Sequence, residues 1–202
     1  MTTAPTMNSA RLGPAEREQN LAALKSKDLD ILVIGGGIVG TGAALDAVTR
    51  GLSVGLVEAR DWASGTSSRS SKLIHGGIRY LEKMDFGLVR EALLERGLLL
   101  QRIAPHLAKP VRFLYPLEKR FLERFYIGAG MMLYDIFSYT GELRPGVPHH
   151  RHLSKRQLQR MTPSLKKDAF VGGLTYYDAT VDDARYVAEL ARTASKYGAH
   201  VA

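Results

Sequence analysis

The segment from Asp30 to Glu58 constrains the fold more than any other part of the chain. It begins with an apolar run at residues 31–34, breaks at a cluster of glycines, and continues with a short helical pattern to Arg50. A second apolar run at residues 54–57 follows and is closed by Glu58. This order predicts a strand, a tight turn, a crossover helix and a second strand parallel to the first. The chain therefore opens with the βαβ unit of a Rossmann-like α/β domain.

The glycines of this turn have the spacing G-x-G-x-x-G, with Gly35, Gly37 and Gly40 at the fixed positions. The first permits a tight turn, the second lets the backbone approach a pyrophosphate, and the third lets helix and strand pack closely. The N–H groups at the start of the helix then point at the phosphates. Glu58 ends the second strand, where an acidic side chain accepts hydrogen bonds from an adenosine ribose. Together these features predict a dinucleotide site rather than an ordinary glycine-rich turn.

The composition narrows the class of partner. The 202 residues are 45% hydrophobic and carry a formal net charge of +8, which favours anionic partners such as phosphorylated substrates or anionic membranes. We expect no nucleic-acid partner, because the basic residues are spread along the chain and no zinc-finger or RNA-recognition pattern occurs. Without cysteine, the chain has no disulfide framework, no thiolate nucleophile and no thiolate metal site.

The rest of the chain alternates helical and strand-like patterns. Helices are expected at residues 14–24, 85–103, 120–139, 154–161 and 182–196, and strands at residues 111–117, 170–177 and 200–202. Ser154 is expected to be the N-cap of one helix, and either Asp182 or Asp183 that of another. Residues 141–152 are expected to form a loop. The largely apolar segment 120–139 is expected to be core or a partner face. A membrane-surface role is the alternative, because Lys119, Arg120 and Arg124 stand beside its aromatic residues.

Residues 67–82 carry the most specific motif of the chain. They read Ser-Ser-Arg-Ser-Ser-Lys-Leu-Ile-His-Gly-Gly-Ile-Arg-Tyr-Leu-Glu and follow the glycine turn and the strand that ends in Glu58. In this setting the sequence closely resembles the FAD-dependent glycerol-3-phosphate dehydrogenases of the membrane-associated respiratory type. Further matches lie at residues 88–93, 104–107, 134–135 and 177–185, so the resemblance covers about residues 28–202.

The resemblance implies a glutathione-reductase-like FAD-binding domain of ββα architecture and the beginning of an α+β substrate domain. Enzymes of this family are considerably longer, so we expect a fragment. The implied division is a flexible segment at 1–27, the first part of the FAD-binding domain at 28–104, the first part of the substrate domain at 105–180, and a return to the FAD-binding domain at 181–202.

The resemblance also implies a function. Such an enzyme oxidises sn-glycerol 3-phosphate to dihydroxyacetone phosphate by hydride transfer to FAD and passes the electrons to a quinone. It implies a cytoplasmic protein, peripheral on the inner face of the cytoplasmic membrane, and a homo-oligomer at full length. A related FAD-dependent oxidase and a truncated, non-catalytic nucleotide-binding module remain alternatives. An NAD-dependent dehydrogenase would share the glycines but would not explain the serine-rich stretch.

Several polar residues are candidates for holding the cofactor. Groups able to donate to phosphates or to flavin carbonyls are Ser64, Thr66, Ser67, Ser71 and Lys72. Gly76 and Gly77 remove side chains where the backbone must approach a flat ring. With the glycine turn and Glu58, these residues form the predicted FAD site.

The predicted catalytic residues are Arg79, Tyr80 and His75. A guanidinium binds a phosphate dianion through two hydrogen bonds and stays charged at any working pH. The resemblance implies that Arg79 lies in the active site, with Tyr80 as a hydroxyl partner. An ion pair with Glu82 is the alternative for Arg79. Histidine is the usual general base near neutral pH, so His75 either contacts the flavin, shuttles a proton or is structural.

Two further clusters have structural interpretations. His149, His150 and His152 lack a carboxylate arrangement that would complete a metal site, so we expect no metal there. Asp178, with Asp182, Asp183 and Arg185, is interpreted as a cap and ion-pair network at the last helix.

Overall fold

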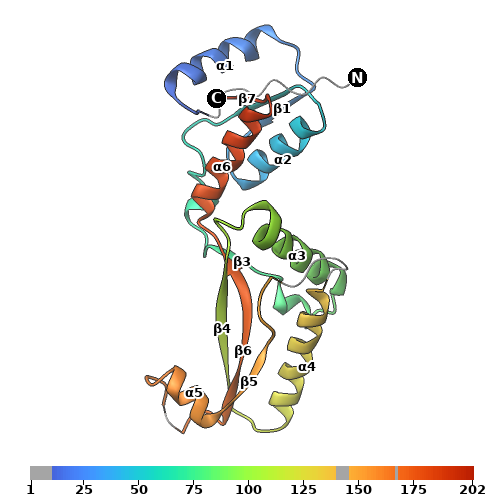
Figure 1. Cartoon of the computed structure of the whole chain (residues 1–202), viewed down its shortest axis with the longest axis vertical. Helices are drawn as coiled ribbons and strands as arrows, with labels where there is room; N and C mark the ends of the chain where they lie inside the picture. The colour runs from blue at the N-terminus through green and yellow to red at the C-terminus, as the bar shows by residue number, and fades with distance from the viewer. Residues whose placement is uncertain (1–10, 140–145, 167) are drawn as a thin grey trace. The chain divides into compact units, whose positions relative to one another are not determined.

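The chain is described by a computed structural model that covers residues 11–139, 146–166 and 168–202, without the side chain of Arg79. It divides into two compact units, which are described separately (Figure 1). The first unit contains the residues up to Lys72 and those from Asp182 onward, and the second runs from Leu73 to Val181. The last segment thus lies in the same compact unit as the glycine turn, and the predicted division into FAD-binding and substrate domains stays a prediction.

The first unit is a parallel sheet between helices. Its strands lie in the order β1 (Ile31–Ile34), β2 (Val54–Val57) and β7 (His200–Val201). Helices α2 (Ile38–Thr49) and α6 (Asp183–Lys196) pack on one face, and α1 (Pro14–Ser26) lies on the other (Figure 1). The predicted βαβ unit and the predicted last strand are confirmed, and the structure shows that this strand is parallel to β2.

Small side chains bring the helices of the first unit close to the sheet. Ala44 and Ala47 of α2 and Ala191 of α6 are buried against Leu56 of β2. On the other face, a Cβ at Gly55 would lie 2.5 Å from Leu24 Cδ2 of α1, so glycine leaves room there for the leucine side chains beneath the helix. This close packing fixes the start of α2, and with it the glycine turn, against the end of β1.

The second unit is built on an antiparallel sheet. The central strand β6 (Gly172–Thr180) pairs along its whole length with β4 (Lys109–Leu117). On its other side it pairs with β3 (Leu73–Ile74) near one end and with β5 (Arg151–Ser154) near the other. Helices α3 (Phe86–Leu98) and α4 (Leu122–Phe137) run beside the sheet, and α5 (Lys155–Met161) lies at its far end (Figure 1). Met131 and Tyr134 of α4 are buried against the sheet.

The structure refines several boundaries. The segment 85–103 is an α-helix followed by one π-helical turn (Leu99–Ile103), and residues 170–171 precede β6. The interpretation of residues 151–152 as loop was wrong, because they begin β5. Residues 141–145 of that expected loop lie outside the described ranges. The caps at Ser154 and Asp182 are confirmed, the former as a capping box with Gln157.

The first unit ends earlier than the domain division suggested. The sequence placed a boundary after residue 104, whereas the compact units divide after Lys72. The reason lies in α3, whose Val89 and Leu93 are buried against Tyr134 of α4. A helix with this pattern belongs to whichever partner buries its apolar face, and here that partner is the second unit.

Candidate cofactor and active site

The glycine turn joins β1 to α2. Gly35 has a φ of +117°, a conformation that favours glycine. A Cβ on Gly40 would lie 2.0 Å from the carbonyl oxygen of Gly35, so a side chain there would force the turn apart. Helix α2 begins after Gly37 without a capping side chain, and the Thr41 N–H donates to the Gly37 carbonyl. The N–H groups of the first helical turn are therefore available to an anion such as a phosphate.

Glu58 lies directly after β2 and faces this turn. Its Oε2 accepts the Gly36 N–H at 2.6 Å, and its Oε1 accepts the Arg60 N–H at 2.9 Å. These two bonds, the Gly36 bond foremost, hold the pKa of Glu58 below its ordinary value. The bonds therefore contribute at neutral pH and are lost only as the pH falls through that lowered pKa. Each oxygen keeps a lone pair with which it can accept a ribose hydroxyl.

These residues fit the pyrophosphate and ribose of FAD. The clearest indication is Gly37, which has ordinary extended backbone and whose Cβ would meet no atom within 4 Å. The packing of the protein does not require glycine there, whereas a pyrophosphate held against the backbone would. Gly35, Gly37, Gly40 and Glu58 thus lie together as the sequence predicted for a dinucleotide site.

The hydroxyl-rich loop starts at the same turn. The Ala63 N–H donates to the Gly36 carbonyl at 2.9 Å, and a short 3-10 helix, η1 (Thr66–Ser68), follows. Within it Ser67 is buried, while Ser68 Oγ donates to the Ala63 carbonyl at 2.7 Å. The loop is thus held in the first unit by its own bonds. The roles predicted for Ser64, Thr66, Ser67 and Ser71 toward FAD stay predictions.

The end of this loop is tied to α6. Ser70 Oγ bonds to Asp183, and Lys72 Nζ lies 3.7 Å from Asp182 Oδ1. Lys72 also has a φ of +58°, an uncommon conformation for a residue with a side chain. The N-cap and first residue of α6 therefore also anchor the loop, a link that the sequence did not reveal.

The predicted catalytic residues of the second unit follow β3. His75 is exposed, and its Nδ1 accepts the Gly77 N–H at 3.1 Å. Gly77 is left-handed (φ +68°) and begins the 3-10 helix η2 (Ile78–Tyr80), in which the Tyr80 N–H donates to the Gly77 carbonyl at 2.7 Å. A cavity of about 150 Å³ is bordered by His75, Gly77 and Tyr80 together with Tyr176 and Asp178. The backbone of Arg79 lies in η2, while its side chain is outside the described part.

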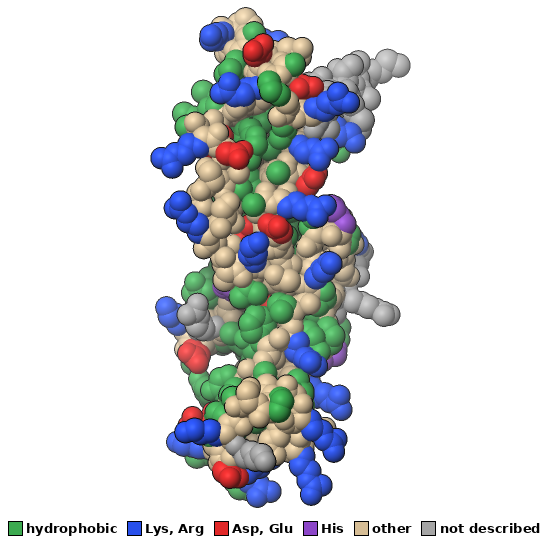
Figure 2. All heavy atoms as spheres, turned by 90° about the vertical axis from the view of Figure 1, so that its left-hand side faces the viewer, with side chains coloured by type: hydrophobic (Ala, Val, Ile, Leu, Met, Phe, Trp, Pro, Cys, Tyr) green, Lys and Arg blue, Asp and Glu red, His purple; other side chains and the backbone are tan. Residues whose placement is uncertain are grey.

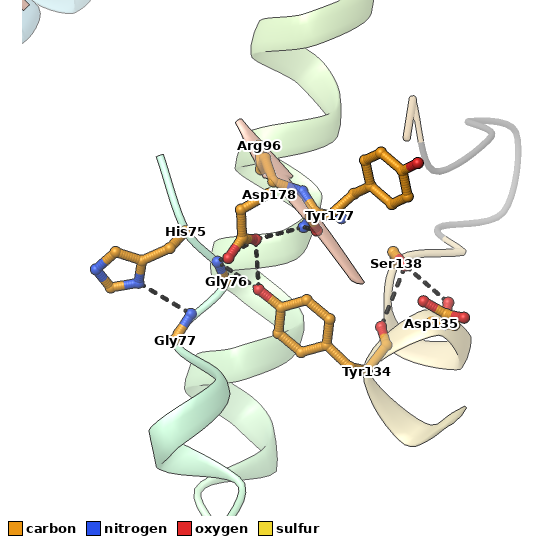
Figure 3. Close-up of polar contacts among 9 residues, drawn as sticks. All are labelled: His75, Gly76, Gly77, Arg96, Tyr134, Asp135, Ser138, Tyr177 and Asp178. Carbon is orange, nitrogen blue, oxygen red and sulfur yellow. Dashed lines mark hydrogen bonds and ion pairs between the residues drawn. The ribbon is translucent and has the colours of Figure 1, made fainter. Parts of the chain in front are cut away.

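Beneath this segment lies a buried polar network (Figure 3). Asp178 Oδ1 accepts from Tyr134 Oη at 2.6 Å and from Arg96 Nη1 at 2.7 Å. The Gly76 N–H donates to Tyr134 Oη at 2.8 Å and approaches Asp178 Oδ1 at 3.3 Å. Arg96 Nη1 also donates to the Tyr177 carbonyl at 3.0 Å. The network thus joins α3, α4 and β6 to the backbone at Gly76.

The structure explains why residues 76 and 77 are glycines. A Cβ on Gly76 would lie 2.3 Å from Leu93 Cδ2 and 2.6 Å from Tyr134 Oη, and a Cβ on Gly77 would lie 2.5 Å from Tyr80 Cδ2. The close packing at Gly76 and the left-handed backbone at Gly77 therefore already favour glycine at the two positions. Their predicted approach to a flavin ring stays a prediction.

Sequence reasoning missed the members of this network. Asp178 was placed with the cap of the last helix, which was wrong: it lies on β6 and pairs with Arg96, whereas Asp182 caps α6. Arg96 was not among the residues singled out from the sequence. Its spacing from Val89 and Leu93 places it on the same helical face, and this spacing could have indicated its burial.

The histidines near residue 150 contact α4. Asp135 Oδ2 lies 2.7 Å from His150 Nδ1 and 3.4 Å from His149 Nδ1. No group of three or more potential metal ligands occurs in the part of the chain that the structure describes.

Comparison with known proteins agrees with this geometry. Residues 30–202 match the family described as FAD dependent oxidoreductase. The chain is 55% identical over 193 residues to "Glycerol-3-phosphate dehydrogenase 2" of Mycobacterium tuberculosis, covering 96% of this chain and 32% of that protein. It is 45% identical over 197 residues to the mitochondrial glycerol-3-phosphate dehydrogenase of Homo sapiens, covering 94% of this chain and 26% of that protein. The chain thus spans about a third or less of the length of these relatives.

Solved structures share the fold. The glycerol-3-phosphate dehydrogenase from Bacillus halodurans, complexed with FAD, matches with a TM-score of 0.62 and 32% identity, over 96% of this chain and 29% of that one. The L-alpha-glycerophosphate oxidase from Mycoplasma pneumoniae matches with a TM-score of 0.66 and 21% identity, over 87% and 44% of the two chains, which shows a common fold. The glycine turn, Glu58 and the family match over residues 30–202 lead to one conclusion: the chain belongs to the FAD-dependent oxidoreductase family, whose cofactor is FAD.

Proposed function

We propose that the protein carrying this chain oxidises sn-glycerol 3-phosphate to dihydroxyacetone phosphate and passes the electrons to a quinone. The observation that carries this proposal is the 55% identity to a glycerol-3-phosphate dehydrogenase across 96% of the chain. The cavity at His75, Gly77 and Tyr80 supports it, because it brings three of the predicted site residues together.

The residues of the second unit have distinct roles in this proposal. FAD, when bound, supplies the acceptor for the hydride. Arg79 holds the substrate phosphate, since a guanidinium offers two parallel hydrogen bonds to a phosphate dianion. The bond from the Gly77 N–H to His75 Nδ1 leaves the proton of a neutral imidazole on Nε2. His75 is therefore arranged to donate a hydrogen bond to a substrate or cofactor oxygen, with the Tyr80 hydroxyl at the same cavity.

Rapid mixing tests this function. The complete protein encoded by the native gene, loaded with FAD, is expected to lose its visible flavin absorbance when glycerol 3-phosphate is added. Reoxidation should then be faster with a soluble quinone analogue than with oxygen, and the reverse order would indicate an oxidase. Flavin that stays oxidised with this substrate contradicts the proposal, and a folded protein that takes up no FAD would be a non-catalytic module.

We further propose that the start of α4 contacts an anionic membrane surface. No helix in the described ranges is both long and apolar enough to cross a bilayer. Phe121, Leu122, Phe125 and Tyr126, called here the α4 patch, are strongly exposed, Phe121 and Phe125 at 78% and 79%. Arg120, Arg124 and Lys155 border a surface hollow beside Phe121. Figure 2 shows Lys and Arg side chains gathered at this end of the second unit, near α5 and the link into α4.

In such a patch the cations can bind anionic lipid headgroups while the aromatic rings enter the region of the acyl chains. The double substitution Phe121→Ser and Phe125→Ser should weaken binding to phosphatidylglycerol vesicles by tenfold or more, because burying each ring is worth about 1.5–3 kcal/mol. Vesicle co-sedimentation measures this effect. Tyr197→Ser, at an exposed aromatic residue of the first unit, serves as the control and should leave binding unchanged. Equal sedimentation of the double variant and the native protein would refute the membrane contact.

A further inference from the structure

We propose that Tyr134, Asp178 and Arg96 form a positioning network that holds the His75–Tyr80 segment in its active conformation. This inference rests on the proposed function, because it assigns that segment to the active site. None of the three residues is itself assigned to substrate or cofactor contact. They act through the backbone amide of Gly76, the point at which the network meets the segment (Figure 3).

The geometry leads from the network to the site in two steps. The Gly76 N–H is held by Tyr134 Oη at 2.8 Å, and the next residue, Gly77, makes the left-handed turn that begins η2. The Gly77 N–H then fixes the His75 ring through Nδ1, and the Gly77 carbonyl accepts the Tyr80 N–H. A shift of the Gly76 amide would therefore move His75 on one side and the helix carrying Arg79 and Tyr80 on the other.

Stability by itself does not account for this network. Arg96 is completely buried, and its Nε and Nη2 find no hydrogen-bond partner among the described residues. The single carboxylate of Asp178, itself 3% exposed, balances its charge. Replacing such a buried pair by apolar residues of similar volume is often neutral or stabilising. A positioning role accounts for the Arg96–Asp178 pair, because the pair orients the Tyr134 hydroxyl and thereby holds the Gly76 amide in place.

The tyrosine keeps its hydrogen at any working pH. Burial raises the pKa of the Tyr134 hydroxyl far above its ordinary range, and the neighbouring Asp178 carboxylate raises it further. Tyr134 therefore donates to Asp178 and at the same time accepts from Gly76. Its ring also packs nearly perpendicular to that of Tyr176, which borders the same cavity as His75.

Tyr134→Phe tests the network in the complete, FAD-loaded protein, since it removes one hydroxyl and keeps the buried ring. We expect faster hydrogen exchange at residues 75–80. We also expect kcat for glycerol 3-phosphate, counted per bound flavin, to fall about ten- to hundredfold with little change in KM, because misplaced reacting groups lower the rate of the chemical step. The visible flavin spectrum should stay that of the native protein.

Tyr115→Phe is the matched control, because its hydroxyl makes a long, exposed hydrogen bond to Glu123 at 3.4 Å, and it should change neither measurement. Asp178→Asn removes the charge that holds Arg96 and orients Tyr134 while nearly conserving volume, and it should reproduce the loss in kcat if Tyr134→Phe does not fold. The inference is overturned if Tyr134→Phe shows native hydrogen exchange and native kcat. It is also overturned if both variants yield less folded protein but the molecules that bind FAD keep the native kcat. If glycerol 3-phosphate does not reduce the native protein, the proposed function fails, and the exchange measurement still decides whether the network holds the segment.

Discussion

Replacing Gly40 by alanine is expected to weaken FAD binding by an order of magnitude or more. The new Cβ would lie 2.0 Å from the Gly35 carbonyl oxygen, and this neighbour is backbone that cannot rotate away. The turn must therefore open, which withdraws the first N–H groups of α2 from the pyrophosphate. Losing even one of these hydrogen bonds, worth about 1.5–3 kcal/mol when the acceptor is charged, weakens binding by roughly ten- to a hundredfold. Titration of the apoprotein with FAD, followed by flavin fluorescence, measures the change.

Two other glycines make this experiment decisive. Gly42→Ala lies two residues further along α2, where the added methyl meets no atom within 4 Å, and should leave FAD binding unchanged. Gly37→Ala also meets open space in the protein, so the apoprotein should keep its melting temperature while its affinity for FAD falls about tenfold or more. If all three variants bind FAD like the native protein, this turn does not hold the pyrophosphate.

Replacing Arg96 by methionine is expected to be the most destabilising single change in the second unit. Arg96 and Asp178 form an ion pair of 2.7 Å whose side chains are 0% and 4% exposed. Removing the cation leaves a buried carboxylate without its charge partner, which typically costs about 3–5 kcal/mol of unfolding free energy. The urea midpoint of the complete protein, followed by far-UV circular dichroism, reports this loss.

The same ion-pair chemistry occurs at the surface of the first unit and supplies the control. Arg50 binds Asp46 at 2.7 Å, but both side chains are more than 60% exposed, so Arg50→Met should cost less than about 1 kcal/mol. Adding Asp178→Asn to Arg96→Met should recover much of the stability, because the buried charge is then gone. Equal urea midpoints for Arg96→Met and Arg50→Met would show that the buried pair contributes little.

Local sequence patterns were sufficient for the elements that depend on neighbouring residues. The βαβ unit follows from two apolar runs and a glycine turn within one stretch, and the structure places Glu58 beside Gly36 as that spacing implies. The caps at Ser154 and Asp182 are equally local, because a capping side chain reaches a backbone N–H only three residues away. The family resemblance in residues 67–82 is likewise a property of consecutive residues, and the family match supports it.

The sequence by itself thus determined the dinucleotide turn, the order of most elements and the family. Only the tertiary structure showed that α3 belongs to the second unit and that residues 151–154 pair with β6. It further showed that Arg96 and Asp178, 82 positions apart in the sequence, form an ion pair beneath Gly76. It also showed that Gly76 is glycine because Leu93 and Tyr134 press against it. The physical reason is the range of the contacts: periodicity and capping act within a few residues, whereas strand pairing and the burial of a charge depend on segments that only folding brings together.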